Sequence, residues 1–235
     1  MMCCQLLFLV VIITSIHTRV CAGSGLADDC EALAQLMTIS TDAAQLLNWD
    51  SLITSGDPTW CCADTTSNFI GCQERNSSTR ITHIVLDSLG ISGNLNGLEH
   101  IHYLEYFTGF DNYLTGSLEI FQPLKYLDHL IMFNNFFTGN LSAISESLYS
   151  SALIVLALDH NFLTGTLDPI TNLKNLQVLR LHSNDLTGDL SGLSGLTELY
   201  QLSLSTNRLT GTLSPLNALV LTRIKPDSSS TAHRL

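Results

Sequence analysis

A glycine recurs through most of the chain at nearly constant spacing, each time inside the same short motif. The motif is Asn-x-[Leu/Phe]-Thr-Gly-x-Leu, and its copies begin at Asn112, Asn135, Asn161, Asn184 and Asn207, with a degenerate copy from Leu89 that keeps Gly93 and Leu95. Successive glycines are 23, 23, 26, 23 and 23 residues apart. A fixed period in the twenties is typical of a solenoid, in which each repeat buries its apolar side against its neighbours.

Apolar residues precede each motif in a second regular pattern. The pattern is Leu-x-x-Leu-x-Leu, as in 153–158, 176–181 and 199–204, with Met132 at one apolar position and Gly109 replacing another. Side chains alternate along a strand, so the leucines enter the core while the residues between them face outward. The sequence therefore predicts an α/β solenoid of about six leucine-rich repeats, with a parallel concave β-sheet.

The polar residues of the motif are predicted to be structural. A buried Asn can bond backbone groups of its own turn and of the neighbouring turn, which otherwise remain unsatisfied. Glycine permits a tight backbone conformation there. A hydroxyl column follows the same turn, at Ser92, Thr115, Thr138, Thr164, Thr187 and Thr210. Ice or glycan binding is an alternative role for such a ladder, but its place in the motif favours a structural one.

The array is predicted to span residues 81–221. The extra residues between Gly139 and Gly165 fall in 142–152, where we expect a bulge or an extra helical turn. The next apolar positions after Leu219 are occupied by Thr222 and Lys225, which predicts that no seventh strand forms. The polar tail 222–235 is predicted to be disordered. An uncapped end exposes core leucines, so either the chain is a truncated relative of longer proteins or a partner such as a co-receptor covers this end.

The N-terminus has the features of a signal peptide. An apolar run from Leu6 to Ile13 precedes small residues that fit cleavage after Ala22, which predicts a signal peptide over 1–22. An uncleaved anchor is the alternative, although roughly 20 apolar residues are needed to span a bilayer. The expected location is secreted or on the extracellular face of the cell surface.

Four cysteines remain after that cut, namely Cys30, Cys61, Cys62 and Cys72. An even set in an oxidising compartment predicts two disulfides within an N-terminal cap over 23–80. Adjacent Cys61 and Cys62 point in different directions, so one should reach back to Cys30 and the other forward to Cys72. A metal site is disfavoured because the segment has no Cys-x-x-Cys spacing and no His. No metal or cofactor is predicted.

The Leu-Thr-Gly-x-Leu ending resembles the plant-specific class of leucine-rich repeat, found in receptor-kinase ectodomains, receptor-like proteins and polygalacturonase-inhibiting proteins. The resemblance covers about Cys30 to Leu219 and includes the cap of that class, at Cys30-Glu31-Ala32-Leu33, Asn48-Trp49, Trp60-Cys61-Cys62 and Gly71-Cys72. It implies that Cys30 pairs with Cys61 and Cys62 with Cys72. The repeat is shorter than is usual in that class and lacks the Ile-Pro after Gly, and surface antigens of protists carry similar repeats. Hormone-receptor and pectinase-inhibitor roles are therefore not transferred.

The net charge and the absence of known catalytic motifs argue against several functions. The net charge of -11 disfavours binding to nucleic acid or anionic lipid. No Gly-x-Ser-x-Gly, His-Glu-x-x-His or phosphate-binding glycine loop occurs, so we predict that the chain is not an enzyme. His160 and His182 fall on adjacent repeats near Asp159, and His83 and His129 share a column. A metal or general-base role is conceivable there, but coincidence among eight histidines is the favoured interpretation.

The outward residues of the predicted strands define a candidate binding surface. Because neighbouring strands lie about 4.8 Å apart, Phe110 and Phe133 should be adjacent, with Tyr106 and Ile131 completing an exposed apolar patch on the second and third repeats. The polar half beside this patch contains His160, Arg180 and His182. Aromatic anchors beside an Arg-bearing rim are typical of a protein or peptide hot spot.

We therefore predict an extracellular recognition module that binds a protein or peptide, with a glycan as another possible ligand. An inhibitor of a secreted enzyme is the main alternative, and a hydrolase is a weaker one. Two Asn-x-Ser sequons predict N-glycans at Asn76 and Asn140.

Overall fold

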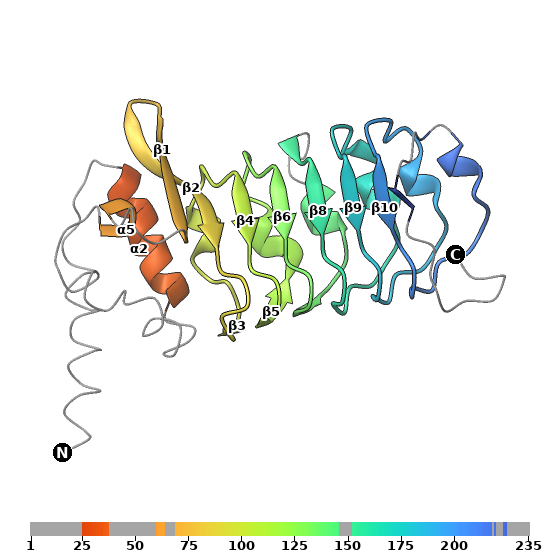
Figure 1. The fold of residues 1–235 in the computed structure, drawn as a ribbon, viewed down its shortest axis with the longest axis horizontal. Coiled ribbons are helices and arrows are strands. Elements are labelled where there is room, and N and C mark those ends of the chain that lie inside the picture. Colours follow the sequence, from red (N-terminus) through yellow and green to blue (C-terminus); the bar gives the residue numbers. More distant parts are fainter. Residues whose placement is uncertain are drawn as a thin grey trace, which may run out of the picture.

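The computed structural model describes residues 25–37, 60–63, 69–145, 152–217, 219 and 223–224. They form the predicted leucine-rich-repeat solenoid, with strands lying side by side along the molecule (Figure 1). The long sheet has the order β1-β2-β4-β6-β8-β9-β10-β11. Its strands are β1 (Ile70–Arg75), β2 (Ser78–Val85), β4 (Tyr106–Thr108), β6 (His129–Ile131), β8 (Val155–Ala157), β9 (Val178–Arg180), β10 (Gln201–Ser203) and β11 (Arg223–Ile224). All neighbours pair in parallel except β1 and β2, which are antiparallel.

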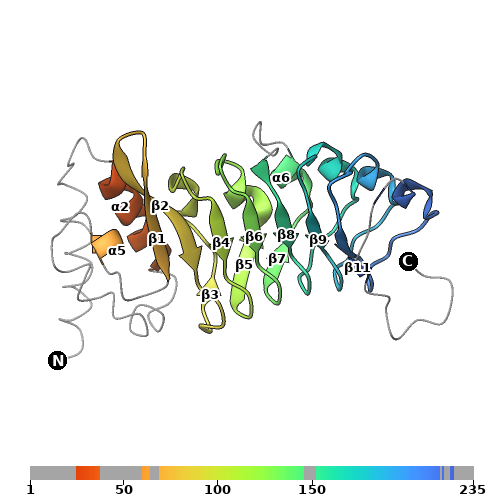
Figure 2. The same ribbon diagram turned by 45° about the horizontal axis from the view of Figure 1, so that its top comes forward.

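A second sheet and a series of short helices complete each repeat. The second sheet consists of β3 (Ser92–Gly93), β5 (Tyr113–Ser117) and β7 (Phe136–Thr138), on the lower side of the molecule in Figure 2. The helices are η1 (Leu98–His100), η2 (Leu118–Phe121), α6 (Ser142–Ser145), η4 (Asp168–Asn172), η5 (Ser191–Leu193) and η6 (Ser214–Leu216). The α6 helix lies where the sequence predicts an extra turn. These elements surround one continuous leucine core.

The core accommodates the one apolar position that lacks a side chain. Gly109 is buried where other repeats have leucine. A Cβ atom on Gly109 would lie 3.3 Å from Met132 Sδ and 3.6 Å from Leu114 Cδ1. The flexible Met132 side chain of the next repeat therefore occupies this space.

The asparagine column bridges successive repeats, as predicted. Asn161 is buried, its Oδ1 accepts from the Phe137 backbone N–H at 2.9 Å, and its Nδ2 donates to the Met132 carbonyl at 3.0 Å. Asn112, Asn135, Asn184 and Asn207 make equivalent bonds. The threonine column is also structural, because Thr138, Thr164, Thr187 and Thr210 each donate to a glycine carbonyl of the preceding repeat at 3.2 Å.

Two columns of the turns have a left-handed backbone. The motif glycines have positive φ, for example 115° at Gly116, as the sequence predicts. The second column was not predicted, because its residues are not glycine. It comprises Ser88, Asp111, Asn134, His160, Ser183 and Thr206, with φ between 51° and 57°.

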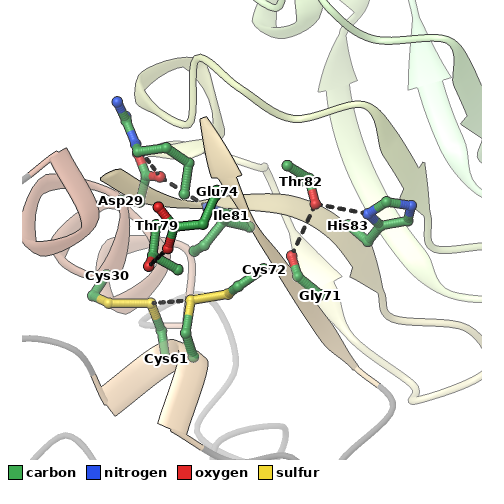
Figure 3. The surroundings of a disulfide bond; sticks show 12 residues. Asp29, Cys30, Cys61, Gly71, Cys72, Glu74, Thr79, Ile81, Thr82 and His83 are labelled. Carbon is green, nitrogen blue, oxygen red and sulfur yellow. Dashed lines mark hydrogen bonds and ion pairs between the residues drawn. A yellow bond between two sulfur atoms is a disulfide. The ribbon is translucent and has the colours of Figure 1, made fainter. Parts of the chain in front are cut away.

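The N-terminal cap has the disulfides that the resemblance implies. Helices α2 (Gly25–Met37) and α5 (Trp60–Ala63) pack at the end of the sheet, joined by Cys30–Cys61, and Cys62–Cys72 links α5 to β1 (Figure 3). Buried Asp29 of α2 accepts two hydrogen bonds from Arg80 of β2, at 2.8 and 2.5 Å, and a third from the Ile81 backbone N–H at 3.0 Å. The Asp29 hydrogen bond raises the pKa of Arg80. This ion pair ties the cap to the first repeat.

The expectation that the array ends before a seventh strand is wrong. Strand β11 pairs with β10, and Ile224 lies opposite the inward-facing Leu202. A strict 23-residue period places Lys225 at that position, so the last repeat is one residue shorter than this period. Within the described ranges, no helix is long and apolar enough to cross a membrane. The predicted signal peptide, the Asn48-Trp49 motif and most of the predicted tail lie outside the described residues.

Candidate functional site

The outward side of the long sheet is the surface predicted to be concave, and is called the sheet face below. Backbone pairing places Tyr106 opposite His129, and Ile131 opposite both Thr108 and Ala157, in the predicted columns. Phe110 and Phe133 stack with ring centroids 4.4 Å apart and planes within 7°. Tyr106 lies between His83 and His129, with centroid distances of 5.6 and 5.3 Å. Tyr106, Phe110, Ile131 and Phe133 are all half-buried, so they are less exposed than the sequence predicts.

Arg180 joins this patch to the polar half of the sheet face. Its guanidinium carbon lies 5.2 Å from the centroid of the Phe133 ring, a cation–π distance. Arg180 Nη2 also lies 2.5 Å from Asp159 Oδ2. One guanidinium therefore contacts both an aromatic ring and a carboxylate.

Asp159 departs from its expected exposure. The sequence places it in an outward column, yet the residue is completely buried, because the longer Arg180 and His182 side chains of the next repeat contact it. His182 Nδ1 lies 2.8 Å from Asp159 Oδ1. Each carboxylate oxygen of Asp159 therefore faces one basic side chain.

Burial shifts the ionisation of this group. It raises the pKa of Asp159, and the positive charges of Arg180 and His182 oppose the rise. Burial also lowers the pKa of His182, while Asp159 opposes that shift. In the apolar half of the sheet face, burial raises the pKa of Asp87. The Thr108 hydroxyl donates to Asp87 Oδ1 at 2.6 Å, and this hydrogen bond opposes the rise.

The polar cluster does not have the geometry of a hydrolase triad. Ser203 Oγ lies 3.3 Å from His182 Nδ1, the same nitrogen that faces Asp159. In a triad, serine and aspartate engage opposite nitrogens of the ring. The other nitrogen, Nε2, instead lies 3.1 Å from His160 Nε2. His182 therefore cannot accept the Ser203 proton on one ring nitrogen while Asp159 orients the ring through the other.

A second aromatic row was not predicted from the sequence. Tyr113, Phe136 and Phe162 follow the first three motif Asn residues directly, with successive ring centroids 6.2 and 5.8 Å apart. They are called the flank ladder, and Tyr113 is 59 % exposed. An open groove of about 550 Å³ separates this ladder from the left-handed column, lined by Asp111, Asn134, His160 and Ser183 on that side. The aromatic residue after three successive motif Asn residues is the sequence signal that could have predicted this ladder.

The two predicted glycosylation sites lie on the surface of the solenoid. Asn76 and Asn140 are both exposed. Asn76 Nδ2 donates to the Tyr103 hydroxyl at 2.7 Å, and Asn140 Oδ1 accepts from the Ser142 backbone N–H at 2.9 Å. In the part of the chain that the structure describes, no group of three or more His, Cys, Asp or Glu side chains is arranged to hold a metal ion.

Comparisons with known proteins agree with this fold. A family model for leucine-rich repeats in two copies matches residues 174–218. The ectodomain of the receptor kinase SOBIR1 from Arabidopsis thaliana superposes with a TM-score of 0.61 at 21 % identity, covering 77 % of this chain and 94 % of that one. The Arabidopsis BIR2 ectodomain gives 0.59 at 23 % identity, covering 78 % and 94 %.

A third solved structure is more similar in sequence over a shorter stretch. The plant peptide hormone receptor RGFR1, in complex with RGF2, is 31 % identical, with a TM-score of 0.51 over 55 % of this chain. The chain spans only 21 % of the length of that receptor. No curated protein gives a significant match.

Proposed function

We propose that this leucine-rich-repeat protein, which resembles the ectodomains of plant leucine-rich-repeat receptors, acts outside the cell and binds a protein or peptide through its sheet face. It performs recognition and not catalysis. The signal peptide predicted over 1–22 and the two disulfides of the cap support an extracellular location.

The observation that carries the proposal is the continuous surface from Phe110 through Phe133 to Arg180. Two stacked rings and a guanidinium are held in fixed positions by neighbouring strands. Rigid aromatic and Arg side chains lose little conformational entropy on binding, and they supply most of the energy at protein interfaces. The Asp159 contact keeps the guanidinium of Arg180 over the ring, which favours a partner with both apolar and hydrogen-bonding groups.

The comparison with RGFR1 adds support for a peptide ligand. That receptor was solved with RGF2 bound, and it shares 31 % identity with this chain over the matched repeats. Because the match covers a minor part of the receptor, the peptide that it binds is not assigned to this chain.

Affinity capture with matched variants tests the proposal. The protein, made in a eukaryotic secretory host, is immobilised and exposed to extracellular medium, and captured proteins and peptides are identified by mass spectrometry. Phe110→Ala with Phe133→Ala should abolish capture of a specific partner, while circular dichroism and melting temperature stay nearly unchanged because both rings are half-buried. Tyr113→Ala with Phe136→Ala on the flank ladder is the matched control and should retain capture.

The outcomes separate the alternatives. Undiminished affinity in the Phe110/Phe133 variant would place the site elsewhere, first at the C-terminal end of the array, where Leu213 is 53 % exposed. A secreted enzyme as the partner, with its activity blocked on binding, would assign the inhibitor role. Capture of glycans alone, unchanged by the Phe110/Phe133 substitutions, would contradict the proposal.

A further inference from the structure

Two histidine rings on adjacent repeats face one another at the edge of the sheet face. The Nε2 atoms of His160 and His182 lie 3.1 Å apart, with ring planes at 84°. Two imidazole ligands of one tetrahedral zinc ion have nitrogens about 3.3 Å apart, given Zn–N distances near 2.05 Å. The separation of the two nitrogens is thus close to that of two ligands on one metal ion.

The hydrogen-bonding environment assigns the proton of His182. Its Nδ1 lies 2.8 Å from Asp159 Oδ1, and the negative charge of this carboxylate favours the neutral tautomer that carries its hydrogen on Nδ1 and presents a lone pair on Nε2. His160 is exposed, and exposed side chains reorient on the nanosecond timescale. Its ring can therefore turn a second Nε2 lone pair toward the same point.

Asp159 occupies the place of an outer-shell carboxylate. Histidine ligands in metal sites commonly donate their second ring N–H to a carboxylate, which fixes the ring and increases its basicity. Asp159 is completely buried, and its Oδ1 lies 2.8 Å from His182 Nδ1. A buried carboxylate in this position offsets part of the positive charge that a metal ion brings, while Arg180 neutralises its other oxygen.

We propose that His160 and His182 bind one divalent transition-metal ion of the zinc, nickel or copper class through their Nε2 atoms, with Asp159 positioning His182. Imidazole nitrogens favour these ions over magnesium or calcium. The remaining coordination positions are filled by water or by a donor atom of a bound ligand. The site stands independently of the proposed recognition function, because its assembly needs no partner.

Zinc titration of the protein, prepared without a histidine tag, tests the site. Isothermal titration calorimetry with Zn²⁺ should give one saturable site, and NMR should show shifted Nε2 resonances for both His160 and His182. His160→Asn should remove the site while keeping the fold, because Asn tolerates the left-handed backbone at this position, where φ is 51°. His182→Ala should have the same effect on zinc binding.

A third variant tests the positioning role, and a fourth controls for other histidines. Asp159→Asn should weaken zinc binding by about 10- to 100-fold at unchanged stoichiometry. His102→Ala should leave the site unchanged, although its ring lies 6.5 Å from that of His100. Zinc affinity that survives His160→Asn, or Nε2 resonances that do not respond to zinc, would overturn the proposal.

Discussion

At the scale of single residues, each turn that follows a sheet strand contains two backbone features with opposite energetic consequences. The buried Asn satisfies amide and carbonyl groups of two repeats. The residue before it adopts a left-handed conformation that costs a non-glycine residue about 1–2 kcal/mol. The role of Asn was predictable because the motif repeats it, whereas the left-handed column has no common residue type and gave no signal.

Removal of one motif Asn should destabilise the protein. We expect Asn161→Ala to lower the free energy of unfolding by about 1–3 kcal/mol for each backbone group left unsatisfied, including the Phe137 amide and the Met132 carbonyl. Urea denaturation measures the effect. The exposed Asn172 is the control, and its substitution by Ala should change stability by about 0.5 kcal/mol or less. Equal effects at both positions would contradict the structural role of the column.

Relief of backbone strain should stabilise the protein. Thr206 is exposed and β-branched, with φ of 56°. Thr206→Gly should raise the free energy of unfolding by about 0.5–1 kcal/mol, because the strain removed exceeds the flexibility added to the unfolded chain. Thr210→Gly, at an exposed residue outside the left-handed column, should have the opposite sign. A loss of stability in Thr206→Gly equal to that in Thr210→Gly would argue against strain at this position.

At the scale of elements, alternation along each strand predicted the columns of the long sheet, and backbone pairing confirms them. Three features were not predictable in the same way. The strands of the second sheet lie within the repeat motif, which was interpreted as a turn, so the flank ladder was not predicted. Asp159 is buried by the long Arg180 and His182 side chains of the next repeat, and the alternation of residues along one strand does not predict such burial. Strand β11 follows a repeat one residue shorter than the period.

A buried ion pair stabilises the junction between cap and repeats. Arg80→Ala should destabilise the protein by about 3–5 kcal/mol, because it leaves the buried Asp29 carboxylate without its charged partner. Thermal or urea unfolding detects this loss. The Arg208–Asp185 pair is largely exposed, so Arg208→Ala should cost less than about 1 kcal/mol. Similar losses in the two variants would show that the Asp29–Arg80 contact does not anchor the cap.

At the scale of the whole molecule, the repeat period predicted the fold class because a repeat cannot bury its apolar side alone. The binding surface was predictable only in part. The register of the strands places Phe110 and Arg180 close to Phe133. The contact between His160 and His182 depends on side-chain orientation, which the sequence pattern does not determine.

Passage through the secretory pathway should lead to N-glycosylation at the two sequons. Protein from a eukaryotic secretory host should carry N-glycans at Asn76 and Asn140, because both residues are exposed. Deglycosylation followed by mass spectrometry measures occupancy, and Asn76→Gln and Asn140→Gln assign each site. Absence of any mass shift would weaken the assignment to the secretory pathway.

The central claim is that the sheet face is the recognition surface, and hydroxyl-radical footprinting of the protein with its captured partner tests it most directly. We expect lower labelling of Phe110, Phe133 and Tyr106 in the complex. Labelling of Tyr126 and Tyr200, exposed aromatics outside the apolar patch, should stay constant. Unchanged labelling of Phe110 and Phe133, with protection confined to the flank ladder or to the C-terminal repeat, would contradict the claim.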